Sequence, residues 1–142
     1  MGDRRLGVFD YPLAEKRPEL IEGRRGKRLD DITLDNVVAG EVEMDDLRIT
    51  PAALRMQAEI ARAAGRPMLA ENFERAAEMV DVPQDFLMQV YELLRPGRAK
   101  DKTPLLAAAA RLRRDFGAER IARFVEEAAV IYERRGLFTY RF

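Results

Sequence analysis

The sequence predicts an all-α protein with about five main helices in a small bundle, preceded by an extended N-terminal arm. Three observations support this fold class. Apolar residues recur at the spacing of an amphipathic helix through most of residues 51–135. Prolines and glycines stand where these segments begin and end. No stretch of four or more residues alternates convincingly between apolar and polar side chains, as a half-buried strand would.

Residues that favour helix starts mark where the helical segments begin. Thr50 and Thr103 each stand before a proline, so each can cap a helix whose first position is that proline. The predicted helical segments are 51–64, 67–80, 83–94, 104–116 and 118–135. The side chains expected to face inward are Leu54, Gln57, Ala58, Ala61 and Ala64; Leu69, Phe73, Ala76, Ala77 and Val80; Phe86, Leu87, Val90, Tyr91 and Leu94; and Ile121, Phe124, Val125, Ala128, Ala129 and Tyr132.

Residues 1–28 hold no sustained helical or strand period and are interrupted by prolines and glycines. They nevertheless contain six apolar anchors, which are Val8, Phe9, Tyr11, Leu13, Leu20 and Ile21. Such an arm usually lies on a surface, either of its own domain or of a partner. We favour a partner, because a small core offers few places for six anchors, and we expect residues 29–142 to form a single helical domain.

The residue types argue against a self-contained enzyme. The chain has no His, Cys, Ser or Trp. Zinc ligands of the usual kind, serine and cysteine nucleophiles and the most common general base near neutral pH are therefore absent. Two carboxylates suffice for a glycosidase, but such a site needs a sugar-lined cleft that usually carries aromatic platforms. We therefore assign no catalytic, cofactor-binding or metal-binding residue to this chain.

The acidic stretch 30–50, "DDITLDNVVAGEVEMDDLRIT", carries seven carboxylates and a single basic residue. Read as a calcium loop from Asp31, it has Asn36 where the loop needs Gly and Val42 where it needs Glu. Helix capping accounts for it better: Thr33 can cap a short helix, "LDNVVA", that Gly40 would close. The stretch is predicted to be structural.

Charge and hydropathy narrow the class of partner. Lys and Arg total 25 and so do Asp and Glu, so the net charge is zero. The segment 67–94 could form a helix-turn-helix, but its second helix begins with Asp85 and has no basic residue before Arg95, which disfavours DNA binding. No apolar run approaches the ~20 residues needed to cross a bilayer. We expect a cytoplasmic protein that binds neither nucleic acid nor membrane.

Several segments of the chain, in this order, resemble one known family. They are "YPLAEKRPELI", "GKRLDDITLDNVVAGEV", "DLRIT", "ALRMQAEIARAAGRPMLAENFERAAEMVDVPQDFLMQVYELLRPGRA", "LLAAAARL" and "FVEEAAVIYERR". Together they extend from about Tyr11 to Arg135 and look like the small (gamma) subunit of the adenosylcobalamin-dependent diol dehydratases. This family comprises the propanediol and glycerol dehydratases, which are lyases.

The resemblance implies a specific enzyme assembly. Such dehydratases consist of large, medium and small subunits, commonly as a dimer of this heterotrimer. They convert propane-1,2-diol or glycerol into an aldehyde and water by a radical route that starts at the cobalt–carbon bond. Adenosylcobalamin lies between the large and medium subunits. The small subunit packs on the large one without supplying catalytic groups, in the cytoplasm or, in parts of the family, within a bacterial microcompartment.

The residues expected at the subunit interface are the arm anchors Phe9, Tyr11, Leu13, Leu20 and Ile21, with Arg48 and Arg95 as ion-pair anchors. A different function class stays open at this stage. The chain could be a free-standing helical adaptor that binds an unrelated protein through the arm or through the alanine-rich run "LLAAAA" of residues 105–110.

Overall fold

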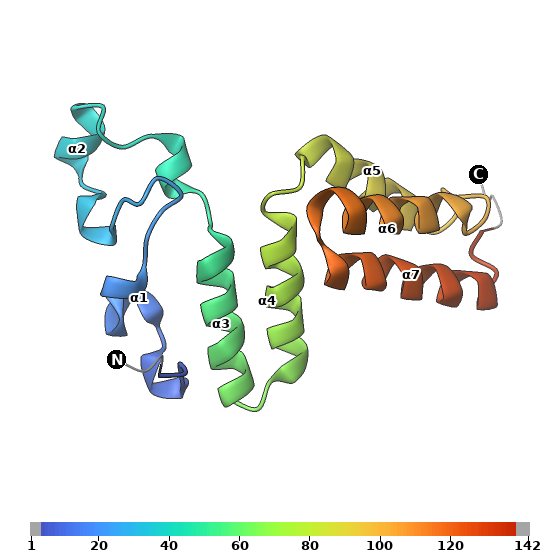
Figure 1. The fold of residues 1–142 in the computed structure, drawn as a ribbon, viewed down its shortest axis with the longest axis horizontal. Coiled ribbons are helices and arrows are strands. Elements are labelled where there is room, and N and C mark those ends of the chain that lie inside the picture. Colours follow the sequence, from blue (N-terminus) through green and yellow to red (C-terminus); the bar gives the residue numbers. More distant parts are fainter. Residues whose placement is uncertain (1–3, 139–142) are drawn as a thin grey trace. The chain divides into compact units, whose positions relative to one another are not determined.

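The fold is that of a computed structural model, which describes residues 4–138 (Figure 1). Helices dominate this part of the chain and no strand occurs in it, although an isolated antiparallel bridge joins Glu22 and Arg28. The all-α prediction is confirmed. The elements are η1 (Val8–Asp10), α1 (Leu13–Lys16), η2 (Pro18–Leu20), η3 (Leu29–Asp31), α2 (Leu34–Val38), η4 (Met44–Leu47), α3 (Pro51–Ala63), α4 (Pro67–Met79), α5 (Gln84–Leu94), α6 (Thr103–Phe116) and α7 (Glu119–Arg134).

The chain divides into two compact units, Met1–Val80 and Asp81–Phe142. The predicted arm therefore shares a unit with α3 and α4. Its first residues, 1–3, and the last residues of the predicted helical domain, 139–142, lie outside the described part of the chain. The division into an arm of 1–28 and a domain of 29–142 stays a prediction. Within residues 4–138, no helix is long and apolar enough to span a membrane.

Helices α3 to α7 match the five predicted segments to within one residue at each end. The Thr50 cap is confirmed, since its Oγ1 accepts a hydrogen bond of 3.2 Å from the backbone N–H of Ala53. The same prediction for Thr103 is wrong. Thr103 is already helical, and the side chain of Asp101 accepts its backbone N–H at 2.7 Å. An acidic side chain two residues upstream thus replaces the threonine at this helix start.

In the first unit, α3 and α4 run antiparallel beside one another (Figure 1). Ala58, Ala61 and Ala70 form their buried contact, and Phe73 packs against it. Small side chains let two helix backbones approach closely. This also explains one wrong detail: Leu69 was expected inside but is 36% exposed, whereas its neighbour Ala70 is fully buried. The close contact places alanine at the seam and the larger side chain at its edge.

In the second unit, α6 packs against α7 and α5 packs against α6. Leu105, Leu112 and Val125 are the largest fully buried side chains. In the alanine-rich run Leu105, Ala108 and Ala109 are buried, together with the α7 residues Ile121, Ala122, Val125 and Ala129. Phe124 and Tyr91 were predicted to face inward but are 42% and 57% exposed, because the buried stripe on each helix is narrower than the predicted face.

Aromatic contacts hold α5 within this unit. The ring of Phe86 stacks on that of Phe116 with centroids 5.9 Å apart, and the guanidinium of Arg111 lies 4.0 Å from the Phe86 centroid. At the other end of α5, the Tyr132 hydroxyl donates a hydrogen bond of 2.5 Å to the backbone carbonyl of Leu94. Both contacts join residues distant in sequence, so they orient α5 against the α6–α7 pair.

We predict that Leu105→Ala lowers the free energy of unfolding by about 2–5 kcal/mol, because it opens a cavity at a fully buried position. Leu106→Ala is the matched control, since it makes the same chemical change in the same helix at a side chain that is 40% exposed. Its effect should stay within about 1 kcal/mol. Urea unfolding followed by circular dichroism measures both, and equal losses would contradict the packing described here.

Candidate functional site

The predicted interface residues of the arm separate into an inward and an outward set. Leu13 is buried in a cluster with Leu6 and Ile60, and Leu20 and Ile21 pack against that cluster. Ile60 belongs to α3, so this half of the arm lies on its own unit. The alternative that the arm packs on its own domain therefore holds for these three anchors, while any role of theirs at a partner stays a prediction.

Phe9 and Tyr11 form the outward set, with exposed fractions of 91% and 65%. Tyr11 lines the rim of an apolar hollow of about 270 Å³ between the arm and the α3–α4 pair. The hollow is lined by Val8, Tyr11, Gln57, Ile60, Ala61, Ala64, Arg66, Leu69 and Phe73. An exposed aromatic ring beside an apolar hollow, as at Tyr11, is typical of a surface that another molecule covers.

A buried carboxylate that the sequence analysis did not single out fixes the arm. Asp10 is 4% exposed, and its two oxygens accept hydrogen bonds from the backbone N–H of Gly7 at 2.8 Å and from Arg17 at 3.1 Å. These bonds, the Gly7 bond first, hold the pKa of Asp10 below its ordinary value. The carboxylate therefore turns the chain from η1 back toward α1. In the sequence, the only signal was an acid three residues after a glycine.

The acidic stretch is organised as predicted. Thr33 Oγ1 accepts the backbone N–H of Asn36 at 3.2 Å, and the Asn36 side-chain amide donates to the backbone carbonyl of Asp31 at 2.8 Å. Gly40 follows α2 with a φ of +77°, the left-handed conformation that glycine adopts without strain. The capping interpretation of Thr33 and Gly40 is confirmed. Among residues 4–138, no group of three or more acidic side chains is arranged to hold a metal ion.

A second buried carboxylate joins the end of this stretch to the loop at residues 22–28. The Asp46 side chain is fully buried, and it accepts hydrogen bonds from Arg25 at 3.1 Å and from the backbone N–H of Glu43 at 2.8 Å. A Cβ at Gly23 would lie only 2.8 Å from the backbone oxygen of Asp46. The loop and η4 are thus in close contact, and position 23 requires glycine.

The two predicted ion-pair anchors are each engaged with a close neighbour in sequence. Arg48 lies 3.3 Å from Asp45, and Arg95 lies 3.0 Å from Glu92. The two arginine side chains are 64% and 47% exposed. Exposed pairs of this kind contribute only about 0.2–1 kcal/mol, so a partner's carboxylate could replace either neighbour at little cost. Their assignment to an interface stays a prediction.

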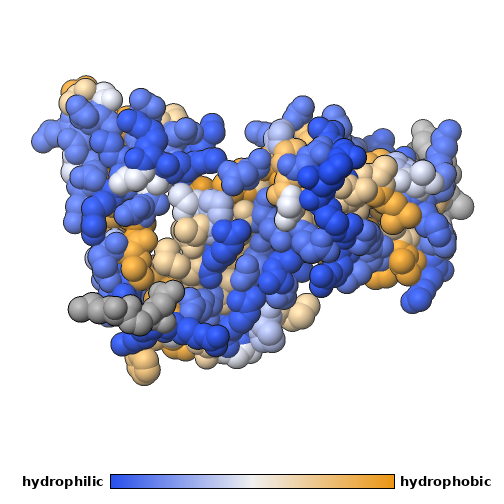
Figure 2. All heavy atoms as spheres, in the orientation of Figure 1, coloured by the Kyte–Doolittle hydropathy of each residue, from blue (hydrophilic) through white to orange (hydrophobic). Residues whose placement is uncertain are grey.

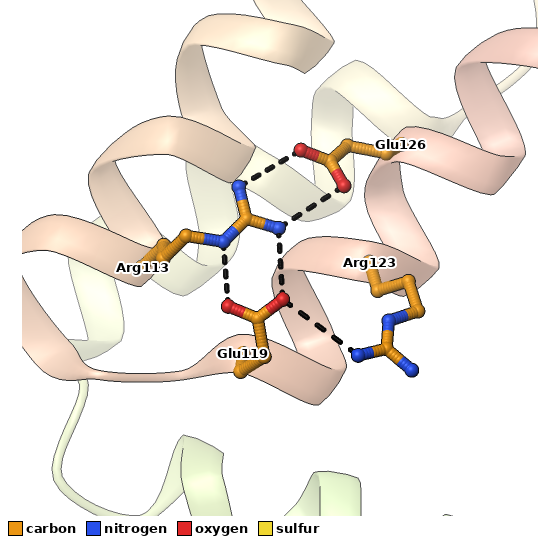
Figure 3. A network of polar contacts seen from close by, with 4 residues as sticks. All are labelled: Arg113, Glu119, Arg123 and Glu126. Carbon is orange, nitrogen blue, oxygen red and sulfur yellow. Dashed lines mark hydrogen bonds and ion pairs between the residues drawn. The ribbon is translucent and has the colours of Figure 1, made fainter.

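The densest polar network of the second unit lies at the α6–α7 connection (Figure 3). The Arg113 guanidinium donates to Glu119 at 2.6 and 3.2 Å and to Glu126 at 2.9 and 3.1 Å, and Arg123 approaches Glu119 at 3.8 Å. Hydrogen bonds from Arg113 lower the pKa of both glutamates, and the two carboxylates raise the pKa of Arg113. The network ties the end of one helix to the next.

The direction of these pKa shifts bears on whether the carboxylates could act as a catalytic acid or base. A catalytic acid or base near neutral pH needs a carboxylate whose pKa is raised, through burial or a like charge. Every described carboxylate with a resolved shift has its pKa lowered instead: Asp10, Glu19, Asp101, Asp115, Glu119 and Glu126. These groups are stabilised in their charged form.

We predict that Asp10→Asn loosens the arm, because it removes the negative charge that Arg17 and the Gly7 N–H stabilise. Amide hydrogen exchange should accelerate across residues 7–17, while α6 and α7 keep their protection. Glu15→Gln, which removes an exposed charge from the same segment, should not change these exchange rates.

The lowered pKa means that Asp10 contributes stability at pH values above its ordinary pKa of 3.8 and loses this contribution as the pH falls further. The difference between wild type and Asp10→Asn should therefore shrink in acid; a constant difference would contradict this role.

Comparison with known proteins agrees with the resemblance. A family model described as dehydratase small subunit matches residues 6–139. The chain is 50% identical over 128 residues to the propanediol dehydratase small subunit of Citrobacter freundii, which covers 90% of this chain and 74% of that protein. It is 49% identical over 132 residues to the propanediol dehydratase small subunit of Salmonella typhimurium strain LT2, covering 93% of this chain and 76% of the relative. The chain therefore belongs to the dehydratase small-subunit family.

Proposed function

We propose that this chain is the small, non-catalytic subunit of a coenzyme-B12-dependent diol dehydratase, in which it stabilises the large catalytic subunit. The observation that carries the proposal is the family match over residues 6–139 of a chain that lacks His, Cys and Ser. The enzyme would convert a 1,2-diol into an aldehyde and water. Both curated relatives are named for propanediol, which favours propane-1,2-diol over glycerol as its substrate.

The geometry supports a role outside the chemistry. The shifted carboxylates are held in ion pairs or by backbone N–H groups, and none of them has a raised pKa within the described chain. About half of the side chains that the long helices bury are alanines, whereas large apolar residues such as Phe9 and Val38 are exposed. A chain of this kind is expected to gain stability from its partners, which would be the large and medium subunits, as a dimer of heterotrimers.

The residues present do not fit adenosylcobalamin itself. The apolar hollow beside the arm has a volume of about 270 Å³. Pockets for drug-sized ligands span roughly 300–1,000 Å³, and a corrinoid is larger than such ligands. A second hollow of about 680 Å³ is open and charged, and its Arg62 is paired with Glu74 at 3.0 Å. The proposal therefore assigns the cofactor to the large and medium subunits and derives no step of the reaction from this chain.

The test is co-expression of the large and medium subunits with and without this chain. Aldehyde formation from propane-1,2-diol is then measured after adenosylcobalamin is added. We expect the complete set to purify as one complex, and the set without this chain to lose most of its activity through poor assembly or a lower thermal midpoint. Glu126→Gln and Glu119→Gln should leave kcat unchanged in the complete complex, because neither carboxylate acts in the reaction.

Two outcomes would contradict the proposal. One is a large and medium pair that is as active and as stable without this chain as with it. The other is a tenfold or larger fall in kcat for a carboxylate variant that assembles normally, because this chain would then supply a catalytic group. If the chain purifies alone as a stable monomer and binds neither subunit, the result would instead support the alternative function of a free-standing adaptor.

A further inference from the structure

Helix α2 presents an apolar face to solvent. Leu34, Val37 and Val38 occupy the i, i+3 and i+4 positions of this five-residue helix, so they share one side of it. Their exposed fractions are 78%, 49% and 80%, and no residue of α2 is buried. Apolar side chains aligned on a folded helix normally mark the side that packs against something. Here, within the described chain, nothing covers that side.

Polar contacts rather than a core give this helix its shape. Isolated helices shorter than about 12–15 residues are marginal in water, so α2 needs support from outside its own backbone. That support comes from the Thr33 cap and from the hydrogen bond between the Asn36 amide and the Asp31 carbonyl. The Asp46–Arg25 contact then fixes η4, at the other end of the stretch, to the loop of residues 22–28. The apolar face is therefore formed before anything binds to it.

The exposed apolar side chains continue along the rest of the stretch. We define the acidic–apolar surface as the exposed large apolar residues of segment 29–49 together with the carboxylates between them. Its apolar members are Leu29, Leu34, Val37, Val38, Met44, Leu47 and Ile49, with exposed fractions between 40% and 80%. The face of the molecule seen in Figure 2 is largely hydrophilic in the region of α2, which Figure 1 locates, and hydrophobic residues lie at the outer edge of that region. Exposed apolar side chains in a segment that also carries charges are typical of a protein–protein contact.

The charged residues of this segment are almost all acidic. Residues 29–47 carry seven carboxylates and no basic residue. Arg25 pairs with Glu43 and Asp46, and Arg48 pairs with Asp45. Asp30, Asp31, Asp35 and Glu41 make no ion pair with any residue from 4 to 138. Four carboxylates of this segment thus have no basic partner in the described chain, and in the sequence they lie among the exposed apolar residues.

We propose that the acidic–apolar surface docks into an apolar groove rimmed by Lys and Arg on another subunit of the dehydratase. This inference rests on the proposed function, which supplies the partner, and it assigns the contact to a face that differs from the arm. The negative charge would repel nucleic acid, an anionic membrane and the same face of a second copy of this chain. A basic-rimmed protein groove is the occupant that satisfies both the charge and the apolar side chains.

The proposed docking surface lies in segment 29–49, whereas the sequence analysis placed most interface residues in the arm. Leu13, Leu20 and Ile21 are used inside the first unit, where they pack with Ile60. They are therefore less available to a partner than Val38, which is 80% exposed. Of the arm residues, Phe9 and Tyr11 remain candidates for an additional contact.

The test uses the complex of this chain with its large and medium subunits. Val38→Lys removes an exposed apolar contact and puts a positive charge against the basic rim, yet Lys near a helix C-terminus suits α2. Met68→Lys is the matched control, because Met68 is 75% exposed on α4, a helix outside segment 29–49. We expect Val38→Lys to weaken association at least tenfold in a titration of labelled chain against the other subunits, and Met68→Lys to leave it within about twofold.

A charge variant tests the basic rim separately. Glu41→Lys should slow association and weaken its dependence on salt concentration, because an unpaired carboxylate no longer attracts the rim. Glu15→Lys, which reverses an exposed charge on α1, should do neither. Circular dichroism of each variant should match that of the wild type, which shows that any loss of binding is not a loss of fold.

The outcomes separate the two proposals. If the wild type does not associate with the other subunits, the proposed function fails. If the wild type associates and Val38→Lys binds equally well, the function stands and the docking surface is wrong. The surface is also wrong if the isolated wild type forms a dimer that Val38→Lys dissociates, because a second copy would then be the occupant.

Discussion

The close contact of helices through alanine is the constraint on which both units depend. Ala58, Ala61 and Ala70 join α3 to α4, and Ala109, Ala122 and Ala129 are fully buried in the α6–α7 unit. An alanine contact brings backbones near one another but removes little apolar area from water for each residue. Within the described residues, Leu105, Leu112 and Val125 are the largest side chains that are fully buried. Alanines make up half of the buried apolar residues in this part of the chain, while many large apolar residues are exposed.

Buried carboxylates hold the chain in place in regions where few apolar side chains are buried. Asp10 and Asp46 are buried carboxylates, and each is satisfied in part by a backbone N–H and by an arginine. They shape the arm and the acidic stretch, in which residues 4–50 form no helix of more than five residues. Geometry in these regions is therefore set by a few directed bonds. Such segments can present side chains in a fixed arrangement without burying them, which is what a recognition surface requires.

The sequence predicted the helix positions well because prolines at helix starts and glycines at helix ends are local signals. It predicted the buried faces less well. Leu69, Tyr91 and Phe124 were assigned inward by periodicity, but whether a residue at the edge of a face is buried depends on how closely the neighbouring helix approaches. The family was recognised from the order of matching segments, and the capping role of Thr33 was recognised from spacing. The i, i+3, i+4 pattern of Leu34, Val37 and Val38 was readable, yet it is shorter than the window that periodicity needs. The pairings of Asp10 and Asp46 join residues that only the folded chain brings together.

The uncovered face of α2 has a consequence for the abundance of the protein in a cell. A copy made in excess of its partners would keep Leu34 and Val38 in contact with water and with every other apolar surface it met. Such copies are those that chaperones retain and proteases remove, or that aggregate. Copies within an assembly would be protected. The number of surviving copies would then follow the number of partner subunits, so that stoichiometry is enforced after synthesis by the surface of the subunit itself.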